Sequence, residues 1–178
     1  MVFEDSIHMG ISGWFSRRLL PTWFREIDLI DIENIPSGRG AVIISTHAGG
    51  LFDHMLTKGM LPGPQVDFDG FIDDEVELDS IAKEVAAGKN VIVFPEGDSH
   101  DDTTIQSIGA CAAKIALRAA ELSTENQPVI VPIGIHYSER YQFRERVALT
   151  VEPPIEINGS EAELIKIISG EISRASQA

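Results

Sequence analysis

The chain has 178 residues with 43% hydrophobic content, a size and composition that suit one domain with a sizeable core. Acidic residues outnumber basic ones by 28 to 14, and the formal charge of −14 argues against nucleic-acid binding, which depends on clustered Lys and Arg. No apolar stretch approaches the roughly 18 uncharged residues of a membrane span, and no signal peptide with a cleavage site is visible. These features predict a cytoplasmic protein.

The first segment with a distinct character is GISGWFSRRLLPTWFREIDLI, residues 10–30, which holds both tryptophans and three arginines. Trp with Arg suits the headgroup level of a membrane, because the rings tolerate water and acyl chains while guanidinium meets lipid phosphate. The same residues also suit a surface helix that packs Trp14, Leu19 and Trp23 on the domain, and Pro21 predicts that any helix here is short or bent. We expect a membrane-associating segment over residues 1–30, a domain over 31–178, and a protein peripheral on the cytoplasmic membrane face.

Four short apolar runs then predict strands: residues 41–45, 91–94, 129–133 and 147–151. Three of them are too continuously apolar for a sheet with one face exposed to solvent, so they belong in a sheet covered on both faces. Helical patterns run from Leu51 to about Met60, from Glu75 to Ala87 and from Ile105 to Leu122. Ser160 and Glu163 form a capping box before a closing helix. The alternation predicts an α/β fold with a mostly parallel central sheet flanked by helices.

Chemically active residues follow the first three predicted strands. The first strand leads into THAGGLFD, which contains His47 and Asp53. An imidazole and a carboxylate within reach of each other are the smallest set of groups for general base catalysis. The second leads into FPEGDSHDD, residues 94–102, and the third into a stretch with four such residues, which are His136, Arg140, Arg144 and Arg146. Ligands of α/β sheets usually sit outside the carboxyl ends of parallel strands. The sequence therefore predicts a catalytic site at that edge.

The ordered set STHAGGLFD, VIVFPEGDSHDD and VPIGIHY resembles the glycerolipid acyltransferase family, which esterifies glycerol 3-phosphate, dihydroxyacetone phosphate and lysophosphatidic acid. The resemblance covers roughly residues 35–157, and the Phe-Pro-Glu-Gly segment is its most specific element. The lead-in before residue 41 and the Pro-Pro-Ile turn after residue 151 are also similar to the family.

This resemblance implies a mechanism in which His47 takes the proton from an acceptor hydroxyl that attacks an acyl thioester of coenzyme A or acyl carrier protein. Asp53 would fix the tautomer of the imidazole and stabilise the imidazolium. Glu96 and Gly97 match the family's acceptor-binding segment, although Glu96 also suits a structural role that accepts loop N–H bonds. The implied partners are an acyl thioester donor, a glycerolipid or related alcohol acceptor and a membrane surface, without a metal or other cofactor.

One departure from the family concerns spacing, because five residues separate His47 from Asp53 where four are commonest. An extra residue inside a helix would turn the carboxylate by about 100° and break the pair. Gly49 and Gly50 can instead absorb the insertion in the turn before the helix, since glycine adopts conformations barred to other residues.

A second departure concerns the basic residues with which the family grips the acceptor phosphate. Asp74 stands where a Phe-Ile-x-Arg segment would have arginine, and Ser107 stands where lysine would. Arg140, Arg144 and Arg146 remain candidates for phosphate or coenzyme contacts, or else are solvated charges. Alternatively, the natural acceptor lacks a phosphate and its hydroxyl is oriented by Glu96 and Ser99.

Two other functions fit parts of the pattern. A metal-dependent hydrolase would draw on six residues, which are His47, Asp53, His54, His100, Asp101 and Asp102. A catalytically weak relative that binds lipid or acyl thioester at a membrane would explain the missing basic residues. Cys111, the only cysteine, lies on the apolar face of a predicted helix, where we expect it to be part of the core.

Overall fold

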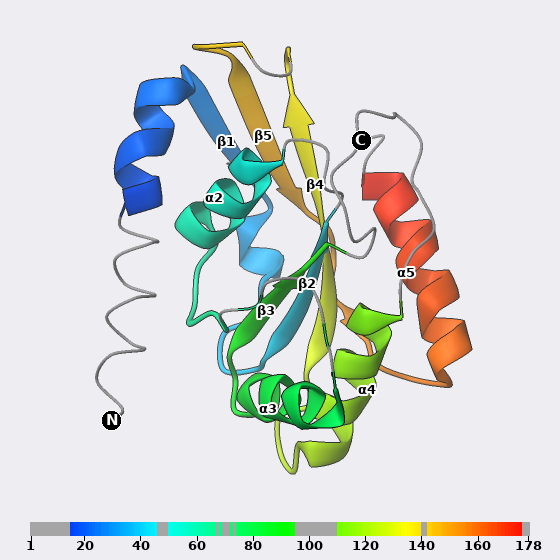
Figure 1. Ribbon diagram of the computed structural model, residues 1–178. Helices are drawn as coiled ribbons and strands as arrows, with labels where there is room; N and C mark the ends of the chain where they lie inside the picture. Colours follow the sequence, from blue (N-terminus) through cyan, green and yellow to red (C-terminus); the bar gives the residue numbers. More distant parts are fainter. Residues whose placement is uncertain are drawn as a thin grey trace.

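The computed structural model in Figure 1 describes residues 15–45, 50–66, 68, 72, 74–94, 110–139 and 142–175. Within these ranges one six-stranded sheet runs in the order β1-β5-β4-β2-β3, and β6 pairs with β4. The strands are β1 (Glu26–Ile30), β2 (Ala41–Ser45), β3 (Asn90–Val93), β4 (Val129–Tyr137), β5 (Arg146–Val151) and β6 (Ile155–Glu156).

The sheet is mixed and mostly parallel, as the alternating pattern predicted. β2 pairs in parallel with β3 and with β4, and β1 pairs in parallel with β5. β4 and β5 are antiparallel, so the chain reverses direction between them. As a result, the carboxyl ends of β2, β3 and β4 share one edge of the sheet with the amino ends of β5 and β1.

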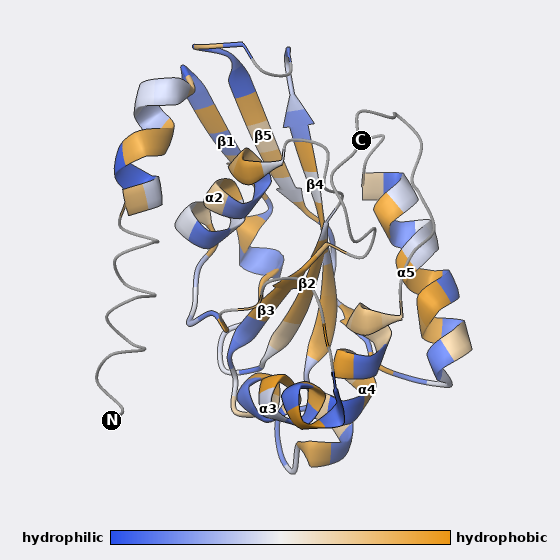
Figure 2. Cartoon of the chain, in the orientation of Figure 1, coloured by the Kyte–Doolittle hydropathy of each residue, from blue (hydrophilic) through white to orange (hydrophobic). Residues whose placement is uncertain are grey.

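Helices cover both faces of the sheet (Figure 1). They are α2 (Leu51–Met60), α3 (Glu75–Ala86), α4 (Cys111–Leu122), α5 (Glu161–Ala175), the short 3₁₀ helix η1 (Ile32–Asn34) and the helical residues 15–23. One buried cluster joins α3, α4 and α5 to Val42 and Ile44 of β2, and a second joins α2 and residues 20–24 to Ala41 and Ile43. Because successive strand residues point to opposite faces, β2 contributes to both clusters. The apolar colour of the inner strands in Figure 2 follows from this double coverage.

The four predicted strands and the helices of residues 51–60 and 75–87 are confirmed to within a few residues. α4 begins at Cys111, and residues 105–109 of its predicted start lie outside the described residues. Cys111 is half-buried against the core, and burial raises the pKa of its thiol to about 11. β1 and β6 were not predicted, because neither carries a continuous apolar run.

The helical residues 15–23 include Pro21, which lies in the last turn, and the helix ends two residues later. Its buried Leu20 belongs to the core, and Arg17 Nε donates to the carbonyl of Gly59 in α2 at 2.6 Å. A Cβ on Gly59 would lie 2.9 Å from the side chain of Ser16, so glycine allows the two helices to approach closely. The division of the chain at residue 30 stays a prediction, and residues 15–30 contribute a helix and a strand to the fold.

No helix among the described residues is long and apolar enough to cross a membrane.

Candidate functional site

The predicted site lies at the edge of the sheet where β2, β3 and β4 end. Ser45 ends β2, and His47 follows two residues later, outside the described residues. Val93 ends β3, and the segment after it contains three predicted site residues that are also not described, Glu96, Gly97 and Ser99. The structure therefore places three of the seven predicted site residues, which are Asp53, Arg144 and Arg146.

Asp53 lies in the first turn of α2 and is completely buried. Its Oδ1 accepts a hydrogen bond from the hydroxyl of Tyr137, the last residue of β4, with 2.6 Å between the oxygens. This is the length of a charge-assisted O–H···O⁻ bond. The negative charge at a helix N-terminus is also favoured by the helix dipole. The edge thus holds a desolvated carboxylate with a specific donor.

Tyr137 was not among the predicted site residues. It ends the quoted motif VPIGIHY, but only the pairing of strands shows that it reaches α2. A polar residue at the carboxyl end of a long buried strand was the available signal.

Gly50, one of the two glycines predicted to absorb the extra residue, directly precedes α2. Gly50 precedes the helix with φ 58° and ψ −126°, and its carbonyl accepts from the Asp53 N–H at 3.1 Å. A positive φ of this kind is open to glycine and strained for other residues. The helix begins at Leu51, so the described part of the insertion lies before the helix, as predicted for Gly50; Gly49 is outside the described residues.

Aromatic rings from three segments surround Asp53 and Tyr137. Trp23 lies 4.9 Å from Phe52, and Phe24 lies 5.4 Å from Phe52 and 6.1 Å from Tyr137, as measured between ring centroids. Phe143, in the turn between β4 and β5, packs edge-on against Trp23 at 5.6 Å. These contacts fix residues 23–24, the first turn of α2 and the end of β4 relative to one another.

Arg144 and Arg146, the two predicted site arginines, are exposed. Arg146 Nε pairs with Glu26 Oε2 at 2.9 Å across the β1–β5 pair. Arg144 has φ 69°, and its N–H donates to the Trp23 carbonyl at 2.8 Å. An exposed ion pair contributes little to stability, so Arg146 can exchange Glu26 for another anion at small cost.

Asp74 has a defined structural partner. It is the N-cap of α3, and its Oδ1 accepts from the Glu77 N–H at 2.8 Å. This satisfies one of the donors that a helix start leaves open, and aspartate is among the preferred residues there. Ser107, the second departure from the family pattern, lies outside the described residues.

The residues of the alternative metal site are mostly undescribed: only Asp53 and His54 fall within the described ranges. The ring of His54 contacts that of Phe94 at 4.6 Å. In the described part of the chain, no three His, Cys, Asp or Glu side chains gather closely enough to hold a metal ion.

His136 lies on the other face of β4 from Tyr137. Its Nε2 is buried and has no hydrogen-bond partner within the part of the chain that the structure describes. A Cβ on Gly134, two residues earlier in β4, would lie 2.6 Å from that nitrogen and would clash with the Ala175 carbonyl. Glycine at this position therefore makes room for the imidazole and for the end of α5.

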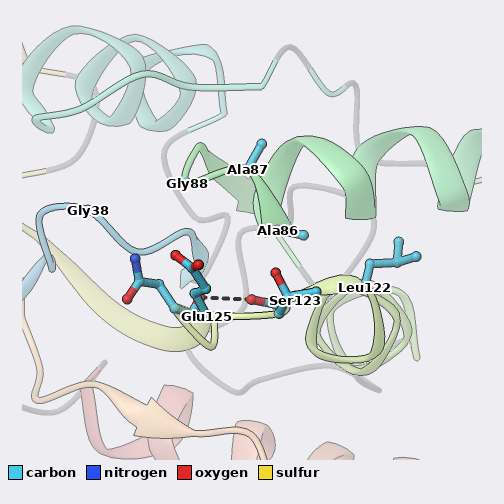
Figure 3. Close-up of a pocket in the computed structure, with 9 residues that line it drawn as sticks. Gly38, Ala86, Ala87, Gly88, Leu122, Ser123 and Glu125 are labelled. Atoms are coloured by element: carbon cyan, nitrogen blue, oxygen red, sulfur yellow. Dashed lines mark hydrogen bonds between the residues drawn. The ribbon is translucent and has the colours of Figure 1, made fainter.

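A pocket shown in Figure 3 lies at the opposite edge of the sheet. Its lining comes from segments that precede β2, β3 and β4, such as Gly38, Gly88 and Ser123. These are the amino ends of the parallel strands, and ligands of α/β sheets bind outside the carboxyl ends. This pocket is separate from the edge that carries Asp53.

No family model matches the chain. Similar curated proteins include glycerol-3-phosphate O-acyltransferase 2 of Saccharomyces cerevisiae, 34% identical over 95 residues, which are 53% of this chain and 13% of that protein. Glycerol-3-phosphate O-acyltransferase 1 of the same yeast is 29% identical over 102 residues, which are 57% of this chain and 13% of that protein. The chain thus spans only a small part of the length of these relatives.

The fold is similar to a solved structure, the 1-acyl-sn-glycerophosphate (LPA) acyltransferase PlsC from Thermotoga maritima. The TM-score is 0.73 with 19% sequence identity, over 99% of this chain and 83% of that chain. The α/β architecture predicted from the sequence is therefore shared along nearly the whole chain.

Proposed function

Because this chain belongs to the glycerol-3-phosphate and lysophosphatidic acid acyltransferase family, we propose that it transfers an acyl group from an acyl thioester to a hydroxyl of a glycerolipid-type acceptor. One observation carries the proposal: the chain buries the ionisable Asp53 at the sheet edge where His47 follows β2. Burial of a carboxylate is costly without compensation, so a desolvated Asp close in sequence to a His favours a functional pair.

In this proposal His47 acts as the general base. Its imidazole takes the proton of the acceptor hydroxyl as the oxygen bonds to the acyl carbon, and the carbon–sulfur bond of the thioester then breaks. The proton passes from the imidazolium to the leaving thiolate, so the enzyme returns to its starting state. Asp53 holds the imidazole in the correct tautomer and stabilises the imidazolium. The donor is acyl-CoA or acyl carrier protein, and Glu96 and Gly97 contact the acceptor.

The first prediction tests this pair. We expect His47→Ala to retain the fold and to lower acyl transfer by about two to four orders of magnitude, the usual contribution of a positioned base. Asp53→Asn should lower it nearly as much. Release of thiol from an acyl thioester, followed with a thiol reagent, measures the rate.

A matched control is Asp79→Asn on α3, which removes a carboxylate that pairs with Arg118 away from the sheet edge. We expect this variant to keep wild-type activity. If folded His47→Ala transferred acyl groups at the wild-type rate, the assigned base would be wrong. Complete absence of thioester consumption by the wild type would favour the second candidate, a weak relative that only binds lipid or thioester.

The second prediction concerns the acceptor. If the acceptor carries a phosphate, we expect Arg146 at the start of β5 and Arg144 in the turn before it to bind that phosphate. Arg144→Ala should then raise the KM for glycerol 3-phosphate more than the KM for glycerol. In the alternative, the natural acceptor lacks a phosphate and its hydroxyl is oriented by Glu96 and Ser99. Asp74→Arg should then improve the use of glycerol 3-phosphate.

Two variants separate these charge effects from folding. Arg174→Ala removes an exposed arginine of α5, so the KM values should not change. Asp74→Asn removes the charge and keeps a good N-cap, whereas Asp74→Arg also removes the cap. If neither Arg144→Ala nor Asp74→Arg changes the preference between the two acceptors, both alternatives fail.

We also propose that the protein is peripheral on the cytoplasmic membrane face. Phe15 and Leu19 of the helical residues 15–23 are exposed, at 53% and 39%, and Phe143 is 66% exposed. The exposed Arg18 lies between Phe15 and Leu19 in sequence, and the exposed Arg25 follows them. Exposed aromatic residues with arginines suit the headgroup level of a bilayer.

A further inference from the structure

We propose that Tyr137 is a positioning residue for acyl transfer, whose hydroxyl holds the Asp53 carboxylate in one orientation by donating to Oδ1. This inference rests on the proposed function, because it concerns the carboxylate that serves His47 there. It assigns a role to a residue 84 positions away from Asp53 in the sequence.

The hydrogen bond is short and shielded from water. The two oxygens are 2.6 Å apart, and Asp53 has no solvent exposure. A hydrogen bond to a desolvated anion is stronger than the same bond in water, because the local dielectric is low. Tyr137 therefore compensates part of the cost of burying this charge.

Both the backbone and the ring of Tyr137 are held in place. Tyr137 pairs with Val147 in the β4–β5 register, which fixes its backbone. Its ring contacts the buried Phe24, and Phe24 packs in turn against Phe52, the residue before Asp53. The donor thus comes from a central strand and the acceptor from the first turn of α2. Two rigid elements set the position of this hydrogen bond.

The Asp53 carboxylate can accept a hydrogen bond from Tyr137 and also serve His47 in the proposed function. A carboxylate offers about four acceptor positions, so Asp53 can accept from Tyr137 at Oδ1 and from further donors at the same time. The bond to Oδ1 also resists rotation of the carboxylate.

The experiment measures kcat and both KM values for wild type, Tyr137→Phe, Asp53→Asn and the double variant. The phenylalanine keeps the ring contacts and removes only the hydroxyl. We expect Tyr137→Phe to lower kcat about tenfold or more, on the scale of one hydrogen bond to a charged group, with KM values within about twofold. In the Asp53→Asn background the same change should cost no more than about twofold, because Tyr137 acts through the charge of Asp53.

Thr57→Val is the matched control. It removes another buried hydroxyl near Asp53, which donates at 2.8 Å to the backbone carbonyl and not to the carboxylate. We expect wild-type kcat for this variant. Three results would overturn the inference. They are a wild-type kcat in Tyr137→Phe, a change confined to KM, and a kcat loss in the double variant that equals the product of the losses in the two single variants. If His47→Ala and Asp53→Asn are inactive while Tyr137→Phe is fully active, this inference fails and the proposed function stands; fully active Asp53→Asn contradicts the proposed function itself.

Discussion

At the scale of single residues, Gly50 decides where the carboxylate of Asp53 is placed. Its backbone conformation, with a positive φ, allows α2 to begin at the next residue. A Cβ at Gly50 would meet no atom of the described residues within 4 Å, and the requirement for glycine comes from the positive φ. The start of the helix, and with it the approach of Asp53 to Tyr137, depends on this one conformation.

The third prediction follows from this conformation. Gly50→Ala should destabilise the protein by about 1–3 kcal/mol, because alanine is strained at this φ and ψ. Gly170→Ala is the control, since Gly170 lies inside α5 with open space around it and ordinary helical φ. That change should stabilise by roughly 0.5–1 kcal/mol. Urea unfolding measures both, and equal stability of Gly50→Ala and wild type would contradict the assigned role.

At the scale of elements, helix starts are determined by local sequence. Asp74 caps α3, and Ser160 with Glu163 forms the predicted capping box of α5. The Ser160 N–H and hydroxyl both donate to Glu163 Oε2, at 2.8 Å and 2.9 Å, and these bonds lower the pKa of Glu163. A carboxyl whose folded pKa is lowered contributes stability above its ordinary pKa, and the contribution is lost as the pH falls through the lowered value.

The fourth prediction uses that linkage. Ser160→Ala should cost about 1 kcal/mol of stability at pH 7, the usual effect of removing a serine N-cap. The difference from wild type should narrow as the pH falls through the lowered pKa of Glu163, because the carboxyl is then protonated in both proteins. Ser160→Thr keeps a capping hydroxyl and should stay close to wild type. Thermal unfolding as a function of pH tests this, and a difference that widened in acid would refute it.

At the scale of the whole molecule, the arrangement of charge and apolar surface bears on membrane binding. The net charge of −14 opposes attraction to anionic lipid, whereas the helical residues 15–23 expose Phe15 and Leu19 beside arginines. Trp23 contacts Phe52 and Phe143, so it is tied to the fold as well as to this surface. Binding to a membrane would then depend on a few apolar side chains against an unfavourable overall charge.

The fifth prediction tests that surface. We expect the protein to sediment with anionic lipid vesicles and Phe15→Ser with Leu19→Ser to weaken sedimentation. Added salt should favour binding, because it screens repulsion between the acidic body and the lipid. Val76→Ser is the control, since Val76 is 77% exposed on α3. Unchanged sedimentation of the double variant would exclude residues 15–19 as the contact.

The elements that the sequence determined by itself are those with local signals. The continuous apolar runs of residues 41–45, 91–94, 129–133 and 147–151 became buried strands, and the Ser160 capping box became the start of α5. Such signals suffice because a buried strand needs apolar residues throughout, and a cap satisfies its own neighbouring N–H groups. The motifs around His47 and the Phe-Pro-Glu-Gly segment likewise indicated the family from sequence alone.

Other features depended on contacts between distant residues. β1 exposes Leu29 and Ile30 and is a strand because β5, more than a hundred residues later, pairs with it. The antiparallel β4–β5 pair brings the amino end of β5 to the site edge, and the hydrogen bond from Tyr137 to Asp53 joins residues 84 positions apart. Periodicity and capping describe neighbours along the chain, whereas these contacts arise only when separate elements pack together. The tertiary structure alone therefore decided which side chain supports Asp53.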